Sequence, residues 1–268
     1  MNNVLLAFGL TIFAGLSTGI GSLFTFFYRK TNTKLLSVAL GFSAGVMIYI
    51  SFVEILQEAR VDLVRELGAK VGPWAAAAAF FAGIFIIALI DKLIPSFENP
   101  HESKLIEAMG QCHGDKKKVR LLRTGLLSTI AITVHNFPEG IATFASTIQS
   151  PSLGVVIAIA VAIHNIPEGI TVSVPIFCAT GNRKKAFIYS FLSGLSEPLG
   201  ALIGYLILLP FLNDTIFGIL FAAVAGIMVF ISLDELLPTA REYGEHHHSI
   251  YGLIAGMAVM EVSLRFLA

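Results

Sequence analysis

The hexamer His-Asn-Phe-Pro-Glu-Gly at residues 135–140 lies in the middle of a long apolar run, and it recurs as His-Asn-Ile-Pro-Glu-Gly at residues 164–169. Histidine, asparagine and glutamate are costly to bury in lipid without partners. Their occurrence twice in such runs indicates a function rather than helix packing alone. In each copy the His and Glu stand at i and i+4, on one helix face about one turn apart, where a single cation can contact both.

Each hexamer also contains a proline in a stretch that is otherwise expected to be helical. Proline has no backbone N–H and cannot donate to the carbonyl four residues earlier. Pro138 and Pro167 are therefore expected to free the carbonyls of Val134 and Ile163 for water or a metal ion.

The composition predicts a membrane protein. The chain has 268 residues, of which 55% are apolar and 13% charged, whereas soluble domains have about 25% charged residues. No basic segment precedes the first apolar run, so we interpret that run as a retained span rather than a cleaved signal. The two cysteines predict neither a disulfide framework nor a cysteine-based zinc site. The sequence has no basic stripe of the kind that binds nucleic acid.

The predicted fold class is an all-α polytopic membrane protein with a single transmembrane domain over residues 1–268. A helix needs ~20 apolar residues to cross a hydrocarbon core of ~30 Å. Eight stretches meet this length, at residues 4–28, 35–56, 71–91, 121–148, 152–179, 186–212, 215–238 and 249–268. A polar loop at residues 92–120 separates the third and fourth spans.

The distribution of Lys and Arg predicts the orientation. The connections after spans 1, 3, 5 and 7 carry 14 of the 18 Lys and Arg residues, and the other side carries 4. Cytoplasmic loops are enriched in these residues. We therefore expect the 92–120 loop in the cytoplasm and both termini outside the cell.

The polar residues of the three central spans are predicted to lie at one depth. Counted from residues 124, 152 and 186, where the apolar runs begin, His135, His164 and Glu197 fall about 16–18 Å into their spans, near the midplane. The fourth and fifth spans are joined by a short loop and must run antiparallel. The two hexamers thus predict a local inverted repeat around a midplane site, which is typical of secondary transporters.

The candidate metal ligands offer nitrogen and oxygen without thiolate. They are His135, Asn136, Glu139, His164, Asn165, Glu168 and Glu197. Such a set suits Zn²⁺, Fe²⁺, Mn²⁺, Co²⁺ or Cd²⁺, whereas Ca²⁺ prefers six to eight oxygens. A single intramembrane His can instead hydrogen-bond across helices, and a single Glu can relay protons. The duplicated block argues for the metal site.

Other polar residues are weaker candidates. Glu54 and Glu58 could line an entrance, and an exit could involve Asp91, Asp234 and Glu235; solvated or capping helix ends are the alternative. Loop histidines can hold metal loosely. The histidines predicted to lie in connecting loops are His101, His113, His246, His247 and His248. The alternative is that these loops are solvated and bind no metal. Glu261 and Arg265 stand at i and i+4 and are expected to pair.

The two hexamers, with Ser196-Glu197-Pro198-Leu199-Gly200, resemble the signature blocks of the ZIP (Zrt/Irt-like protein) family of metal transporters, most of all its bacterial ZupT-type branch. The similarity extends over essentially the whole chain. It implies an elevator-like movement of spans 1, 4, 5 and 6 against the others. His164 departs from some bacterial members, which have another residue there, and this favours zinc at that position.

The resemblance also implies a site for two metal ions, with Glu139 and Glu168 bridging them. One position would have the ligands Asn136, Glu139, Asn165, Glu168 and Glu197. The other would have His135, Glu139, His164 and Glu168.

The expected function is import of divalent transition metals into the cytoplasm across a bacterial plasma membrane. Zinc is the principal candidate, with iron, manganese, cobalt and cadmium as others. The expected partners are these ions and the lipid bilayer, with a homodimer left open. No prosthetic group is expected, and no P-loop pattern indicates ATP as the driver.

Two other functions compete with transport. An intramembrane zinc-dependent hydrolase would use His and Glu to activate water on zinc. Against it, no general base stands outside the ligand set, and no H-E-x-x-H motif occurs. A metal-sensing receptor would bind the ion without moving it.

Overall fold

The computed structural model describes residues 2–27, 33–93, 115–208, 213–243 and 246–267, and these residues form helices with short connections between them. The α-helices are α1 (Asn2–Phe27), α2 (Thr33–Ile50), α3 (Leu56–Leu93), α5 (Asp115–Gln149), α6 (Pro151–Thr180), α7 (Arg183–Gly194), α8 (Ser196–Ile203), α9 (Asp214–Ile231), α10 (Leu237–Tyr243) and α11 (His246–Leu267). Short π-helical segments follow α2, α8 and α9: η1 (Ser51–Ile55), η2 (Gly204–Leu208) and η4 (Ser232–Leu236). The predicted all-α class is confirmed.

Six stretches of the described residues are long and apolar enough to cross a membrane. They are Asn3–Leu23, Ser37–Lys92, Pro151–Phe177, Arg183–Leu206, Asp214–Arg241 and His247–Phe266. The second has 56 residues, far more than the ~20 needed for one crossing. It covers the predicted span at 35–56 from residue 37 onward and all of the predicted span at 71–91. The predicted span at 121–148 lies within α5, which is not among the six.

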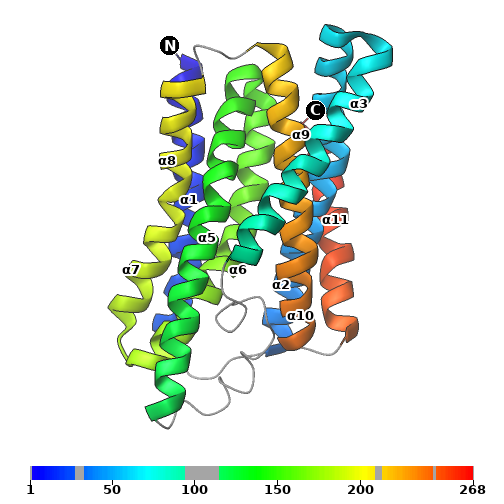
Figure 1. Ribbon diagram of the computed structural model, residues 1–268. Coiled ribbons are helices and arrows are strands. Elements are labelled where there is room, and N and C mark those ends of the chain that lie inside the picture. Colours follow the sequence, from blue (N-terminus) through cyan, green and yellow to red (C-terminus); the bar gives the residue numbers. More distant parts are fainter. Residues whose placement is uncertain (1, 28–32, 94–114, 209–212, 244–245, 268) are drawn as a thin grey trace.

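Helix α3 reverses direction at Gly68. This glycine has a φ of 80°, a conformation that other residues rarely adopt. An added Cβ on Gly72 would collide with the backbone of Leu63 and Val64, so the arms on either side of the turn lie against each other. Figure 1 shows the turn near the top of the molecule, with the second arm descending beside α9.

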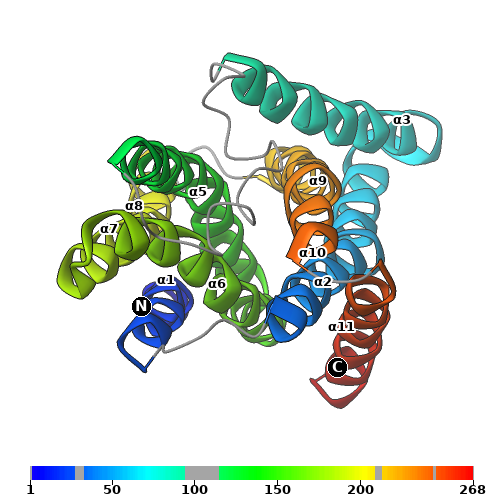
Figure 2. The ribbon, with the colours of Figure 1, turned by 90° about the horizontal axis from the view of Figure 1, so that it is seen from below.

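The helices form two groups, which are separated most clearly in Figure 2. One group contains α1, α5, α6, α7 and α8, and the other contains α2, α3, α9, α10 and α11. Close backbone contacts hold each group together, as small residues permit in membranes. An added Cβ on Gly21 of α1 would collide with Ile166 on α6, and one on Gly45 of α2 would collide with Leu253 on α11. Helix α6 packs on α2, and α5 packs on α9, where the groups meet.

A one-residue connection places the two hexamers side by side. Only Ser150 lies between α5 and α6. Its side chain accepts a hydrogen bond from the Leu153 N–H, and Pro151 occupies the first helical turn, as is typical of helix starts. His135 lies 14 residues before Gln149, and His164 lies 13 residues after Pro151. Both histidines are thus ~20 Å from the same turn.

The prolines of the hexamers do not break their helices. Helix α5 continues through Pro138, and α6 continues through Pro167. One proline removes a single N–H donor, and the neighbouring hydrogen bonds maintain the helix. The interruption falls instead at Leu195, between α7 and α8, directly before Ser196 and Glu197.

Candidate metal centre

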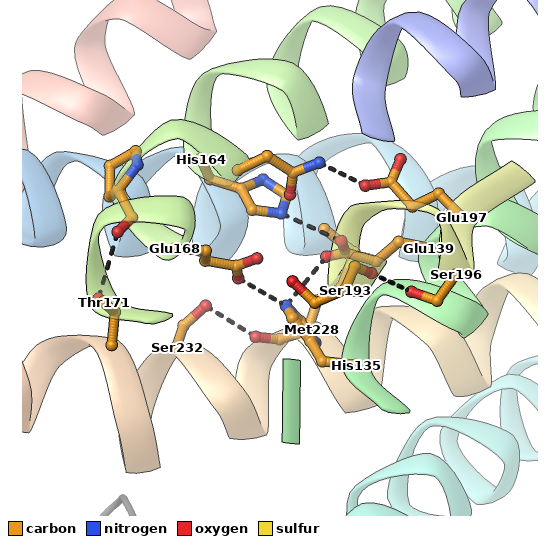
Figure 3. A network of polar contacts seen from close by, with 12 residues as sticks. His135, Glu139, His164, Glu168, Thr171, Ser193, Ser196, Glu197, Met228 and Ser232 are labelled. Carbon is orange, nitrogen blue, oxygen red and sulfur yellow. Dashed lines mark hydrogen bonds and ion pairs between the residues drawn. The ribbon is translucent and has the colours of Figure 1, made fainter. Parts of the chain in front are cut away.

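The seven predicted ligands come together from three helices of the first group. Helix α5 contributes His135, Asn136 and Glu139, helix α6 contributes His164, Asn165 and Glu168, and α8 contributes Glu197. All seven are buried, with exposed fractions of 3% or less. Figure 3 shows His135, Glu139, His164, Glu168 and Glu197 turned toward one another. Such a polar cluster within apolar helices is the usual mark of a functional site.

Each histidine faces the glutamate of the other hexamer. His164 Nε2 lies 3.1 Å from Glu139 Oε2, and His135 Nε2 lies 3.1 Å from Glu168 Oε1. The contact within the first hexamer, from His135 Nε2 to Glu139 Oε1, is longer at 3.4 Å. The i and i+4 spacing predicted that one cation can contact the His and Glu of the same copy. The structure adds a crossed pairing between copies, which arises because α5 and α6 pack with their motifs at equal height.

Three of these side chains are already spaced for a metal ion. The ligand atoms of His135, His164 and Glu168 all lie within 4.8 Å of one another. Two donors of a tetrahedral Zn²⁺ site, each bonded at ~2.1 Å, stand about 3.4 Å apart. Binding therefore requires the donor atoms to approach one another by at most about 1.4 Å, which side-chain rotation can supply. Within the described residues, this is the group of His, Cys, Asp and Glu that meets the spacing.

A backbone carbonyl fixes the tautomer of His164. Its Nδ1 lies 3.1 Å from the Ala160 oxygen. A carbonyl can only accept, so Nδ1 carries the proton and donates it. This is the support that metal-binding histidines usually have. Nε2 shares a proton with Glu139 Oε2 at 3.1 Å, and loss of that proton makes the Nε2 lone pair available to a cation.

The asparagines orient the carboxylates. Asn165 Nδ2 donates to the Ala14 carbonyl at 2.9 Å and also to Glu197 Oε1. Asn136, with its amide nitrogen turned toward the surrounding acceptors, donates to Ile132 O and Glu168 Oε2, each at 3.2 Å. The remaining acceptors Asn165 Oδ1 and Glu197 Oε2 are buried and make no hydrogen bond within the described protein. Buried acceptors of this kind fit a bound cation.

The backbone brings Glu197 close to the first hexamer. An added Cβ on Gly140 would collide with the Glu197 backbone, and one on Gly200 would collide with Phe137. Helices α5 and α8 are therefore in direct backbone contact at Glu197 and again about one turn later, at Gly200. This close contact explains the glycines at positions 140 and 200, because a Cβ at either position would collide with the other helix.

The weaker candidates lie outside the seven-residue cluster. Glu54 and Glu58 are half-buried on η1 and the start of α3, Asp91 is half-buried near the end of α3, and Asp234 is exposed on η4. Glu235, also on η4, lines a small pocket together with Glu168. The other residues that line this pocket are Leu40, Ile132, Thr171, Leu236 and Thr239.

The loop histidines do not join the cluster where they are described. His101 and His113 lie outside the described residues, as does the side chain of His246. His247 and His248 lie in the first turn of α11 and not in a loop as predicted. His247 is exposed and stacks on Tyr251, and His248 is half-buried.

Sequence reasoning missed two polar residues at the contact between the helix groups. Asp62 lies between the predicted spans at 35–56 and 71–91, yet it is completely buried on α3. Gln149 Nε2 donates to it at 2.8 Å. The sequence did contain a signal for a helix at Asp62. Glu54, Glu58 and Asp62 recur every four residues and would share one helix face.

Comparison with known proteins gives consistent results. The family described as ZIP Zinc transporter matches residues 98–263. The Zinc transporter ZupT of Oceanobacillus iheyensis is 61% identical over 268 residues, covering 100% of both chains. That of Clostridium perfringens is 61% identical, covering 98% of this chain and 96% of its own. That of Lysinibacillus sphaericus is 62% identical, covering 98% and 97%.

Proposed function

The chain belongs to the ZIP zinc transporter family, and on this premise we propose that it carries zinc across the membrane through the buried His–Glu centre. It is a multi-pass protein of the bacterial cell membrane and a transporter rather than an enzyme, so the hydrolase alternative is set aside. One observation carries the proposal: the ligand atoms of His135, His164 and Glu168 lie within 4.8 Å of one another inside apolar helices.

The centre is proposed to hold two ions that share Glu139 and Glu168. Toward α8, the ligands would be Asn136, Asn165 and Glu197 with the two bridging glutamates. The hydrogen-bond-free Asn165 Oδ1 and Glu197 Oε2 support this position. Toward the histidines, the crossed His–Glu pairs at 3.1 Å support a second position.

The donor atoms replace water around the ion. A divalent cation must lose most of its hydration shell to enter an apolar bundle, and carboxylate, imidazole and amide donors offset that cost. Bound protons must leave these ligands before the metal binds. Iron, manganese, cobalt and cadmium are proposed as further substrates because the nitrogen and oxygen set accepts them as well.

Eight spans, outer termini and transport into the cytoplasm complete the proposal. The 14-to-4 distribution of Lys and Arg supports this orientation. The pocket shared by Glu168 and Glu235 supports release on the side away from Ser150. The two helix groups of Figure 2 support an elevator-like movement of α1 and α5–α8 against the others. A homodimer is also proposed, and the mass of the purified complex tests it.

Zinc uptake by purified protein in sealed liposomes tests the function. Glu139→Ala and Glu168→Ala should abolish uptake, because each removes a bridging carboxylate. Glu66→Ala is the matched control, since Glu66 is exposed and lies away from the centre. Near wild-type flux in both bridging variants would overturn the site assignment, and zinc binding without flux would favour a sensor.

A further inference from the structure

A buried carboxylate joins the two helix groups far from the metal centre. Asp62, on the first arm of α3, is completely buried. Its Oδ2 accepts a hydrogen bond of 2.8 Å from Gln149, the last residue of α5. Its Oδ1 accepts one of 3.2 Å from Arg65, which also lies 3.8 Å from Asp214 at the start of α9. Of these partners, only Gln149 belongs to the group that carries the centre.

The Gln149 bond therefore depends on how the groups are arranged. A buried carboxylate needs hydrogen bonds to both oxygens, because leaving a charge unsatisfied in an apolar environment is costly. Arg65 stays with Asp62 whatever the groups do, since both are on α3. Gln149 satisfies the second oxygen only while the groups remain in contact. If they separate, water must take its place.

The hydrogen bond between Asp62 and Gln149, called the bridge below, lies on one side of the metal centre. Gln149 is 10 residues beyond Glu139 on α5, or ~15 Å along the helix. Between them, Ala142 and Ala145 are 3% and 2% exposed and belong to a core cluster with side chains of the second group, such as Phe221. Packed apolar side chains thus separate the centre from the bridge.

The opposite side of the centre is open to a pocket. Helix α6 runs away from Ser150, so Thr171 lies on the far side of Glu168 from the bridge. Both residues line the pocket together with Glu235 and Thr239 of the second group. The centre therefore adjoins a pocket on one side and a sealed contact on the other.

We propose that the Gln149–Asp62 hydrogen bond is a latch that closes the Ser150 side of the centre and must open before an ion enters from that side. The proposal rests on the transport function proposed above. Because water can replace Gln149 at Asp62, the open state keeps the carboxylate solvated. The latch thus biases the protein toward the state seen here without locking it.

Cysteine labelling tests the latch without measuring transport. Ala145→Cys reports on the sealed contact in a chain whose Cys112 and Cys178 are replaced by serine. The protein is held in zinc-free nanodiscs, where a bulky water-soluble maleimide reaches both faces. Gln149→Ala should raise the labelling rate about tenfold or more, as loss of a hydrogen bond to a charged group implies. Gln149→Glu should raise it further by repulsion from Asp62.

Two controls separate latch opening from other effects. Gln57→Ala removes an exposed glutamine that donates to the Phe52 carbonyl on the adjoining segment η1, within the same helix group, and it should leave the rate unchanged. Ser249→Cys reports on a buried contact inside the second group, and its protection should persist in both Gln149 variants. Loss of that protection would mean general loosening and would overturn the latch.

The result is independent of flux. Equal labelling of Ala145→Cys with Gln, Ala or Glu at position 149 would overturn the latch while leaving zinc transport standing. Faster labelling in a protein that moves no zinc would overturn the transport function while retaining the latch contact.

Discussion

The Nε2 atom of His164 on α6 lies 3.1 Å from Oε2 of Glu139 on α5, so each copy of the hexamer completes its site with a residue from the other. The relationship makes the centre a property of the helix pair. Neither hexamer alone presents the crossed His–Glu geometry.

Replacing His164 by Gln should weaken the apparent affinity for zinc by about tenfold or more, as loss of a ligand or its support typically does. Glutamine is uncharged and can still ligate weakly, so some flux should remain. Initial uptake rates over a range of zinc concentrations measure this effect. His247→Gln, at an exposed histidine, should match wild type, and an equal change in both variants would remove His164 from the ligand set.

Asn165→Ala should disturb both stability and transport. The change removes the donor to the Ala14 carbonyl and to Glu197, and an unsatisfied buried acceptor costs about 1–3 kcal/mol. We expect a lower thermal unfolding temperature together with weaker zinc uptake. Asn213→Ala changes an asparagine that caps α9, and it should affect stability without altering zinc affinity. Unchanged uptake in Asn165→Ala would exclude a role in orienting Glu197.

Zinc should stabilise the purified protein against thermal unfolding, because it binds the folded centre and not the dispersed ligands. At 100 times the dissociation constant, the gain is about 2.7 kcal/mol. Addition of EDTA should reverse it. The double variant Glu139→Ala/Glu168→Ala should show no zinc-dependent shift, and a full shift in that variant would place the binding elsewhere.

A cysteine in place of Gly110 should be shielded from impermeant thiol reagents in intact cells. The expectation follows from the excess of Lys and Arg on that side. The background again lacks Cys112 and Cys178, and permeabilised cells provide the positive control. Ready labelling from outside would reverse the topology and with it the direction of import.

Local spacing predicted which residues form the metal centre better than it predicted which of them contact each other. Depth in the apolar runs brought His135, His164 and Glu197 to one level, as the structure has them. The i and i+4 rule also predicted the Glu261–Arg265 pair, which is confirmed at 2.9 Å. Tyr49, which donates to the same carboxylate, could not be foreseen because 212 residues separate it from Glu261.

Features that depend on packing between helices could not be predicted from the sequence. Asp62 lies in a charged stretch between two predicted spans, where a loop is expected. Its burial depends on packing between helices, which brings Gln149 of α5 against it. The prolines predicted freed carbonyls at the hexamers, and α5 and α6 continue through them, whereas the interruption of the helix lies at Leu195. A proline shows where one hydrogen bond is lost, whereas neighbouring helices decide whether the chain bends there.

The single-residue connection at Ser150 makes the hairpin of α5 and α6 intolerant of changes in length. Inserting or deleting one residue between the two hexamers would turn one motif by about 100° and move it by ~1.5 Å relative to the other. His164 would then leave Glu139, although every ligand remained in the chain. Segments of 29 residues from one histidine to the next should therefore be exchangeable between relatives only as intact units, while length variation accumulates elsewhere.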